Sequence, residues 1–311
     1  MTKALAHPNI ALIKYWGKQD KLGNFPATPS LSITLDGLVT ETVLTDGSTD
    51  RFVINGKEQD DPKVAGFLGA LRASLSVPPL EIETVNNFPT GAGLASSASG
   101  FAALMTAINA HCQFGLSTEM MSDWARQGSA SAARSMYGGF VSLVPPLWRA
   151  YPAANVDHWP LNVVIAITSE EKKDVGSTEG MRRTAATSPF YPAWVKDAPE
   201  DYATASEAIA QRDFAALAGV AELSCLKMHS IMLTSVPTLS YWNPTTLSCM
   251  DGVRDMRRNG IAAFFTIDAG PQVKVVCLPD SVEQVQATLR DIPGVLTTKV
   301  CALGGNARIL D

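Results

Sequence analysis

The sequence has 311 residues, of which 46% are hydrophobic and 18% are charged, and its formal net charge is −5. A chain of this length buries a substantial core as one large domain or two ordinary ones, and its negative charge disfavours a nucleic-acid-binding surface. We find no apolar run close to the ~20 residues that a membrane span needs and no signal peptide at the start, so we expect a cytoplasmic protein without a membrane partner.

The cysteines and histidines limit the chemistry further. The five cysteines are scattered, odd in number and never spaced as CxxC, which is typical of reduced thiols in the cytoplasm. They are Cys112, Cys225, Cys249, Cys277 and Cys301. The four histidines form no pair at helical spacing, so we expect no zinc site. An anionic ligand would therefore depend on local lysine and arginine side chains.

The first predicted elements are strands and a helix. Residues 40–56 (TETVLTDGSTDRFVING) alternate in polarity around a DG turn and predict a β-hairpin. Residues 61–75 (DPKVAGFLGALRASL) begin with an Asp-Pro pair, which is typical of a helix start. Residues 80–87 (LEIETVNN) predict a strand.

That strand leads into a segment of small residues at 86–104, NNFPTGAGLASSASGFAAL, which carries no charge. Its small and apolar residues continue from Leu94 to Asn109 with helical spacing, so we expect a loop that feeds a buried helix. A second helix is expected from Thr118 to Gln127.

The middle of the chain contains the predicted domain boundary. Residues 144–160 (VPPLWRAYPAANVDHWP) have four prolines and no periodicity, so we divide the chain into domains 1–155 and 156–311. Residues 161–169 (LNVVIAITS) then predict a buried strand.

The second half predicts an α+β layer. Helices are expected over Tyr202 to Gly219 and Pro244 to Arg258. After them come a strand (262–268), a turn (269–271), a strand (272–279), a helix (281–292) and a strand (297–303). This order is similar to a split β-α-β, ferredoxin-like arrangement.

The small-residue segment admits several interpretations. Backbone N–H groups at a glycine-rich turn, continued by a helix N-terminus, form an anion site, and serine hydroxyls can add donors or bind a metal. The Lys of a Walker A loop is missing, and the third glycine and the following acidic residue of a Rossmann fingerprint are missing as well. A helix whose small residues only permit close packing is the alternative without a ligand.

The segment PTGAGLASSASG resembles the phosphate loop of the GHMP kinase superfamily, and the longer NFPTGAGLASSASGFAAL resembles diphosphomevalonate decarboxylases. Four other segments resemble that family in the same order. They are PNIALIKYWGK (8–18), RQGSASAARSMYGGF (126–140), KKDVGSTEGM (172–181) and FTIDAGPQ (265–272). The resemblance implies the GHMP kinase fold, an α+β fold with an N-terminal ATP-binding part like ribosomal protein S5 domain 2 and a ferredoxin-like C-terminal part.

The resemblance implies an ATP- and Mg²⁺-dependent decarboxylation of (R)-5-diphosphomevalonate to isopentenyl diphosphate, ADP, phosphate and CO₂ in the mevalonate isoprenoid pathway, by a homodimer. Five positions depart from the family: Ala130 and Ala133 stand where Gly and Cys or Ser are common, Thr28 and Gln272 where Asn is usual, and Thr178 where some members have Arg. Alternatives are a decarboxylase of mevalonate 5-phosphate, a GHMP small-molecule kinase that does not decarboxylate, and a non-catalytic regulator.

Two residues are predicted to carry the chemistry. Asp268 ends an apolar strand, where a carboxylate is costly without partners, and we interpret it as the group that orients or deprotonates the C3 hydroxyl. Arg134 lies among residues too small to shield it, and its planar fork suits the substrate carboxylate and the positioning of Asp268.

The remaining site residues follow from the resemblance alone. The substrate phosphates are assigned to Tyr15, Lys18, Ser129, Ser177 and Thr178, and Arg134 completes the substrate set. The nucleotide is assigned to Gly91, Gly93, Leu94, Ala95, Ser96, Ser97 and Ser99, with Ser97 also on the metal. Lys172 and Lys173 by themselves are typical of a surface pair.

Overall fold

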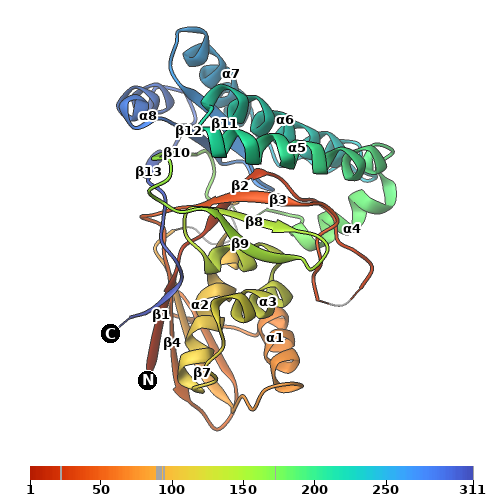
Figure 1. Cartoon of the computed structure of the whole chain (residues 1–311), viewed down its shortest axis with the longest axis vertical. Coiled ribbons are helices and arrows are strands. Elements are labelled where there is room, and N and C mark those ends of the chain that lie inside the picture. The colour runs from red at the N-terminus through yellow and green to blue at the C-terminus, as the bar shows by residue number, and fades with distance from the viewer. Residues whose placement is uncertain (22, 89–92, 94, 172, 311) are drawn as a thin grey trace.

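The computed structural model describes residues 1–21, 23–88, 93, 95–171 and 173–310. Figure 1 shows an elongated molecule in which β2, β3, β8 and β9 cross the middle, between a lower part with α1, α2 and α3 and an upper part with α5 to α8. The strands are β1 (Thr2–Ala6), β2 (Asn9–Ile13), β3 (Ser30–Thr34), β4 (Thr40–Asp46), β5 (Arg51–Ile54), β6 (Lys57–Glu58), β7 (Leu80–Asn86), β8 (Phe140–Val144), β9 (Arg149–Ala154), β10 (Asn162–Ile167), β11 (Ala263–Ile267), β12 (Val273–Cys277), β13 (Thr297–Cys301) and β14 (Arg308–Leu310).

The helices cover the faces of these sheets. They are α1 (Pro62–Arg72), α2 (Ser96–His111), α3 (Thr118–Gly128), α4 (Ser177–Thr187), α5 (Tyr191–Gln211), α6 (Phe214–Leu233), α7 (Pro244–Arg258) and α8 (Val282–Arg290), with the 3₁₀ helices η1 (Ala130–Met136) and η2 (Pro279–Ser281). The predicted start of α1 is confirmed, because Asp61 accepts the N–H groups of Lys63 and Val64 and Pro62 opens the helix. The predicted helices α3 and α7 are also present.

The six-stranded sheet has the order β14-β1-β4-β7-β5-β6. The hairpin predicted over residues 40–56 is wrong, because β7 lies between β4 and β5, antiparallel to the first and parallel to the second. The alternating residues of β7 pair along all of β4, from Thr40 opposite Asn86 to Asp46 opposite Leu80. The DG turn therefore separates two strands that share a neighbour. In Figure 1 the two termini lie close together, where β14 pairs with β1.

The central sheet has the order β2-β3-β8-β9. Residues 144–160 were predicted to lack periodic structure, but β9 lies inside this segment and pairs antiparallel with β8. Most of β9 is exposed, so its sequence lacks the strong alternation of a half-buried strand. The central sheet matters for the candidate site because β2 ends beside the cavity, and Ser30 and Ser32 of β3 bind Arg134.

The third sheet has the order β11-β12-β10-β13, and all of its neighbours are antiparallel. With α8 between β12 and β13, this confirms the ferredoxin-like arrangement expected for the C-terminal part. The α+β class and the GHMP kinase fold are confirmed with it. β11 is an edge strand of this sheet, and residue 268 follows directly after it.

One helix prediction is wrong. The helix expected over Tyr202 to Gly219 is the end of α5 and the start of α6. Arg212 ends α5 in the left-handed region with φ of 57°, and the Asp213 side chain accepts the Ala216 N–H to cap α6. Among the described helices, α6 has the length and apolar composition of a membrane span, but 61% of that stretch is buried inside the protein, as in a core helix.

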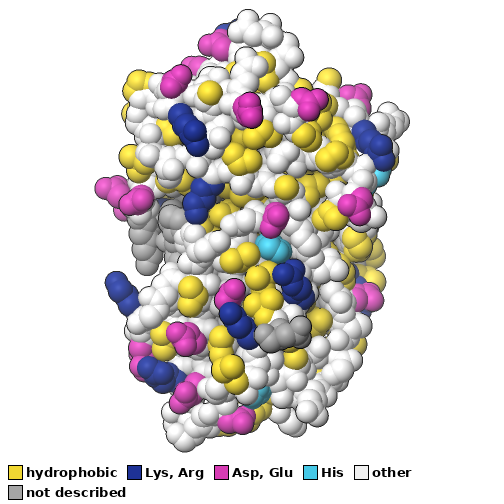
Figure 2. All heavy atoms as spheres, turned by 90° about the vertical axis from the view of Figure 1, so that its left-hand side faces the viewer, with side chains coloured by type: hydrophobic (Ala, Val, Ile, Leu, Met, Phe, Trp, Pro, Cys, Tyr) yellow, Lys and Arg dark blue, Asp and Glu magenta, His cyan; other side chains and the backbone are white. Residues whose placement is uncertain are grey.

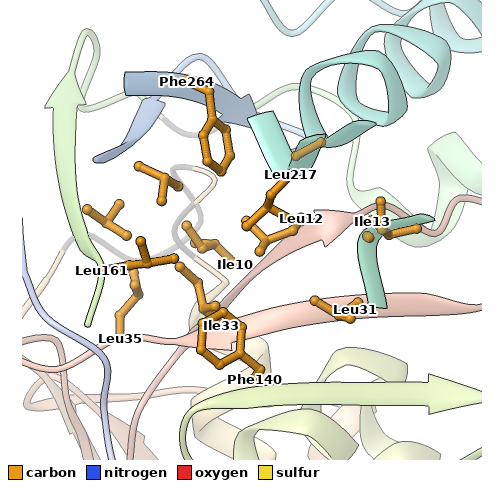
Figure 3. Close-up of a cluster of buried hydrophobic side chains, with 14 of the residues drawn as sticks. Ile10, Leu12, Ile13, Leu31, Ile33, Leu35, Phe140, Leu161, Leu217 and Phe264 are labelled. Carbon is orange, nitrogen blue, oxygen red and sulfur yellow. The ribbon is translucent and has the colours of Figure 1, made fainter. Parts of the chain in front are cut away.

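A hydrophobic core joins the central sheet to the upper layer. Figure 3 shows Ile10 and Leu12 of β2 between Phe140 of β8 on one side and Leu217 of α6 and Phe264 of β11 on the other. All five side chains are at most 2% exposed. Because β2 and β11 both enter this core, the residues that follow each strand are held in fixed relative positions.

The described surface and cysteines agree with the composition. Figure 2 shows acidic and basic side chains interspersed over one face, rather than a continuous basic patch. All five cysteines are free thiols, and four of them are buried.

Candidate active site

One cavity of about 560 Å³ collects all but one of the predicted site residues that the structure describes. Its walls are the residues after β2, the starts of α1, α2 and α4, helix η1 and the residues after β11. The predicted residues on these walls are Tyr15, Lys18, Gly93, Ala95, Ser96, Ser97, Ser129, Arg134, Ser177, Thr178 and Asp268. Segments that are far apart in the sequence thus meet at one cavity.

Asp268 is held in this cavity by two buried lysines. Lys14 Nζ lies 2.5 Å from Oδ1, and Lys274 Nζ lies 3.2 Å from Oδ2. Burial alone would raise the pKa of Asp268, but the charges of Lys14 and Lys274 outweigh it and hold that pKa well below its usual range. Oδ2 is buried against Lys274 Nζ, whereas the Asp268 side chain as a whole keeps 24% exposure at the cavity, so the carboxylate can still accept a hydrogen bond from a substrate hydroxyl.

The backbone before Asp268 is fixed by side chains of α6, which replace the missing neighbour of edge strand β11. Glu222 Oε1 accepts the Phe265 N–H at 3.1 Å, and Cys225 Sγ accepts the Ile267 N–H at 3.2 Å. His229 Nε2 lies 3.2 Å from the Ile267 carbonyl, so this ring nitrogen carries the proton. Burial lowers the pKa of His229 to about 3 and raises that of Cys225 to about 11, so both groups are neutral near pH 7.

The turn after Asp268 is tied to β10. Gln272 Oε1 accepts the Thr168 N–H at 2.7 Å, and its Nε2 donates to the Ser169 carbonyl at 2.6 Å. Thr246 Oγ1 donates to the Pro271 carbonyl at 2.8 Å. Gln272, one of the departures from the family pattern, therefore fastens the turn that aims Asp268 into the cavity.

Arg134 is only 2% exposed, so the expectation that its small neighbours leave it unshielded is wrong. Polar side chains of β2 and β3 enclose it: Nε donates to Ser32 Oγ at 2.9 Å, Nη1 to Ser30 Oγ at 2.6 Å, and Nη2 to Asn9 Oδ1 at 3.2 Å. Burial lowers the pKa of Arg134 to about 10, which keeps it protonated at neutral pH. Its fork has five N–H donors, so donors remain for a ligand carboxylate.

The structure assigns the positioning of Asp268 to the two lysines instead of to Arg134. Arg134 and Asp268 line the same cavity, but no ion pair within 4.0 Å joins them. The Arg134 guanidinium lies 5.7 Å from the centre of the Tyr15 ring. Burial raises the pKa of Tyr15, so its hydroxyl is a neutral donor.

Lys18 stands at another part of the cavity wall. Its Nζ donates to Asn24 Oδ1 at 2.6 Å. Burial lowers the pKa of Lys18, and a bound anion would raise this pKa again. An ammonium held by one neutral acceptor is suited to a second, anionic partner.

The start of α4 contributes a cation besides its hydroxyls. Lys173 is half-buried and donates to Ser177 Oγ at 2.8 Å and to the Ala269 carbonyl at 3.0 Å, so it is not a surface lysine. Burial lowers its pKa to about 8. Thr178 is exposed at the cavity wall. Lys172 lies outside the described residues.

The N-terminus of α2 faces the cavity without a cap. Ala95 precedes the helix with φ of 55°, and no described side chain bonds the first N–H groups of the helix. Such N–H groups attract an anion, and the macrodipole adds partial positive charge. Ser96 and Ser97 line the cavity there, and Ser97 Oγ lies 3.4 Å from Ser129 Oγ. A phosphate group at this point would meet both hydroxyls and backbone donors.

Ser99 is not brought into the cavity. Its side chain is completely buried, and its Oγ lies 2.6 Å from Thr40 Oγ1 of β4. Ser99 comes two residues after Ser97, which places it on the opposite side of the helix, toward the six-stranded sheet. Gly91 and Leu94, also assigned to the nucleotide, lie outside the described residues.

Sequence reasoning missed several residues of the site. Lys14 and Lys274 hold Asp268, Asn9 holds Arg134, and Lys63 lines the cavity at the start of α1. A signal for the first two existed: each lysine interrupts an otherwise apolar strand segment, NIALIK or VKVVC. A buried lysine requires an anionic partner.

A metal site built from protein carboxylates is absent from the described residues, which contain no cluster of three or more His, Cys, Asp or Glu that could hold an ion. Mg²⁺ commonly keeps waters and binds through nucleotide phosphates with few protein ligands. The Ser97 hydroxyl, exposed at the α2 N-terminus, fits such a role.

Comparisons with known proteins find two family models that together span most of the chain. Residues 6–145 match the diphosphomevalonate decarboxylase-like N-terminal domain, and residues 163–303 match the mevalonate 5-diphosphate decarboxylase C-terminal domain. The diphosphomevalonate decarboxylase of Aspergillus fumigatus is 36% identical over 323 residues, covering 92% of this chain and 79% of that protein.

The chain is also similar to solved structures of the same family. The mevalonate diphosphate decarboxylase of Enterococcus faecalis, described with a mevalonate diphosphate mediated ATP-binding mechanism, aligns with a TM-score of 0.89 at 38% identity, over 100% of this chain and 98% of that one. MDDEF in complex with MVAPP, AMPPCP and magnesium aligns with a TM-score of 0.91 at 37% identity, with the same coverage of both chains.

Proposed function

The chain belongs to the diphosphomevalonate decarboxylase family, and we propose that it is a carboxy-lyase that converts (R)-5-diphosphomevalonate and ATP to isopentenyl diphosphate, ADP, phosphate and CO₂. The observation that carries this proposal is the carboxylate of Asp268. It is ionised, held by two buried lysines and exposed in part to the cavity. Arg134 lies in the same cavity to bind the substrate carboxylate.

The first step is a phosphoryl transfer. The C3 hydroxyl attacks the γ-phosphorus of ATP, and a new O–P bond forms as the bond to the bridging oxygen of ADP breaks. The Asp268 carboxylate accepts the hydrogen bond of that hydroxyl and receives its proton. Because the pKa of Asp268 is depressed, the carboxylate is a weak base. It therefore acts mainly by orienting the hydroxyl, and it takes the proton late, when the oxygen already bonds phosphorus.

The second step releases CO₂. Hydroxide leaves C3 poorly, whereas the phosphate of the C3 phosphate ester leaves readily with the C3–O electron pair. The C1–C2 bond then breaks, and its electrons form the C2=C3 double bond. Arg134 orients the carboxylate for this step through a fork fixed by three polar side chains, so little reorganisation is needed.

The nucleotide phosphates fit at the uncapped start of α2, beside Ser96 and Ser97. Mg²⁺, when bound, would neutralise charge on these phosphates, with Ser97 Oγ as its protein ligand. The 5-phosphates of the substrate are assigned to Tyr15, Lys18 and Ser129, with Ser177 and Thr178 beside them. The two phosphate groups would thus approach from different walls of one cavity.

Two related activities remain alternatives. One is a decarboxylase of mevalonate 5-phosphate, since Thr178 presents a hydroxyl where some relatives have a charge beside the diphosphate. A kinase that stops after phosphoryl transfer is the other alternative. Phosphorus-31 NMR of the reaction with mevalonate 5-diphosphate tests the proposal, and we expect signals of isopentenyl diphosphate, ADP and free phosphate in equal amounts. Accumulation of a 3-phosphate ester would contradict it.

We also propose that the protein is a homodimer and acts in the cytoplasm. The dimer rests on the family resemblance alone. The cytoplasmic assignment is supported by the five reduced cysteines, which are unpaired in the structure.

Replacing Ser97 by alanine tests the nucleotide assignment. We expect Ser97→Ala to raise KM for Mg-ATP by about three- to tenfold, the value of one neutral hydrogen bond, with little change in KM for the substrate. Ser99→Ala serves as the comparison, because its hydroxyl faces β4, and it should alter nucleotide affinity much less. Calorimetric titration with ATP measures the nucleotide affinity of both variants. Normal ATP binding with lost binding of mevalonate diphosphate would assign the loop to the wrong ligand.

Replacing Lys18 by methionine tests which phosphate this wall binds. A charge-assisted contact is worth about 1.5–3 kcal/mol, so Lys18→Met should raise KM for the 5-diphosphate at least ~10-fold and reduce its advantage over the 5-monophosphate. Lys21→Met is the matched control, because Lys21 lies over the Phe25 ring outside the cavity lining. Steady-state kinetics on both substrates decides. An equal loss on both would mean that Lys18 serves the phosphate that they share or the chemistry.

A further inference from the structure

Lys274 lies where a lysine is rarely found. It is the second residue of β12, opposite Thr266 of β11 and Ile165 of β10, and its side chain is completely buried. A buried ammonium is costly unless it is paired, and burial lowers the pKa of Lys274. The structure provides partners on two sides of the side chain.

One partner belongs to the catalytic turn and the other to the phosphate loop. Lys274 Nζ lies 3.2 Å from Asp268 Oδ2 and donates to the Gly93 carbonyl at 2.7 Å. Asp268 receives a second cation from Lys14, whereas no other described side chain bonds the Gly93 carbonyl. The Lys274 ammonium is therefore a single group that contacts both.

The backbones of the two segments also meet directly. Gly93 has φ of +82°, and a Cβ at this position would lie 2.9 Å from Gly270 Cα, two residues after Asp268. Only glycine permits such an approach. Gly93 of the phosphate loop thus packs against the turn that carries Asp268, and Lys274 contacts both segments. A shift of one segment would alter the lysine's distance to the other.

From this geometry we propose that Lys274 is a positioning residue that couples the phosphate loop to Asp268, so that nucleotide binding and the placement of the carboxylate depend on each other. The proposal rests on the function proposed above. It assigns Lys274 a role distinct from that of Lys14, which holds Oδ1 and bonds none of the loop residues that the structure describes.

The surroundings of Asp268 let its titration be followed. The other titratable groups around it are Lys14, Tyr15, Arg134, Lys173, Cys225 and His229. The pKa of His229 is lowered to about 3 and that of Cys225 raised to about 11 by burial, so neither changes charge between these values. Lys173, with a pKa lowered to about 8 by burial, titrates on the alkaline side. Because substrate and nucleotide titrate alike for every variant, an acidic limb that moves between the wild type and a Lys274 variant reports Asp268.

The direction in which the pKa of Asp268 should change follows from the loss of the positive charge of Lys274. The Lys274 cation lowers the pKa of Asp268, so removing it raises that pKa, and the acidic limb of the pH profile moves to higher pH. Removing the donor to Gly93 loosens the loop as well, so affinity for a nucleotide falls. A residue that only neutralised Asp268 would produce the first change without the second.

The test compares Lys274→Met with the wild type and with Lys299→Met. Lys299 of β13, in the same sheet, also donates to a distant backbone carbonyl, that of Asn87 at 3.2 Å, but it does not contact Asp268. Two quantities are measured: the pH profile of kcat/KM for mevalonate diphosphate, and the Kd for AMPPCP. Lys274→Met should move the acidic limb upward and weaken AMPPCP binding by roughly tenfold or more. Lys299→Met should change neither.

If Lys274→Met does not fold, Lys274→Gln carries the test, because its amide can still donate to Gly93 while the charge is lost. It should move the acidic limb and keep AMPPCP affinity within about threefold of the wild type. A Met variant in which only one quantity moves, or neither, overturns the coupling, as does a Gln variant with an unmoved limb. A wild type that turns over no mevalonate diphosphate would instead overturn the proposed function.

Discussion

Asp268→Asn should lower kcat roughly 10³-fold or more while KM for ATP stays within about threefold. The Asn side chain keeps the shape but has no charge and can accept no proton. It also leaves Lys14 and Lys274 without their anion. Because the carboxylate acts on the C3 hydroxyl and not on the nucleotide, the loss should appear in turnover. Single-turnover and steady-state kinetics measure it.

Asp201→Asn is the matched control for this experiment. Asp201 is also a buried aspartate in an ion pair with a lysine, Lys227 at 2.9 Å, but it joins α5 to α6 away from the cavity. Its variant should lose some stability and little kcat, and thermal melts of both variants show whether folding is affected. An Asp268→Asn enzyme that keeps a tenth of the wild-type kcat would remove Asp268 from the mechanism.

Arg134→Lys should lower kcat/KM for mevalonate diphosphate by about 100-fold, the value of a bidentate charge-assisted contact at its upper range. A lysine keeps the charge, but its single ammonium cannot reach Asn9, Ser30 and Ser32 and also bind a carboxylate in a fixed plane. The effect on KM for ATP should be small. Steady-state kinetics with each substrate varied separates the two.

Arg149→Lys controls for the general effect of losing a guanidinium, because Arg149 pairs with Glu119 and Asp123 on the surface of β9. That variant should be close to wild type in both kinetics and stability. If Arg134→Lys stays within threefold of the wild type, the fork does not position the substrate, and a simple positive charge suffices.

The sequence predicted local features of the fold well and pairings poorly. Helix α1 was predicted because its cap and proline are local signals, and the strands and helix of the C-terminal layer because their periodicity is strong. The pairing of β4 with β7 was missed, since the DG turn suggested a hairpin and nothing local indicates that a third strand lies between. The helix break at Arg212 was missed because one left-handed residue leaves little trace in an apolar pattern.

The dependence on local sequence signals also explains which residues of the candidate site were predicted and which were missed. Asp268 and Arg134 were identified because each lies in a motif that resembles a known family. Their partners were not, because the contacts join residues far apart in the chain: Lys14 and Asp268 are 254 positions apart, and Lys274 and Gly93 are 181 apart. Ser99 lies inside the phosphate-loop motif, yet helix geometry turns it toward the sheet. A motif therefore predicted which segments meet, while the fold decided which side chains face the cavity.

The central claim is that this site transfers a phosphate to mevalonate 5-diphosphate and then decarboxylates the product. Parallel measurement of ADP and CO₂ release by the wild-type protein, with mevalonate 5-diphosphate and with mevalonate 5-phosphate, tests it most directly. We expect equal rates of ADP and CO₂ release on the 5-diphosphate and a lower kcat/KM on the 5-phosphate. ADP release without CO₂ would contradict the decarboxylase assignment, and a preference for the 5-phosphate would contradict the substrate.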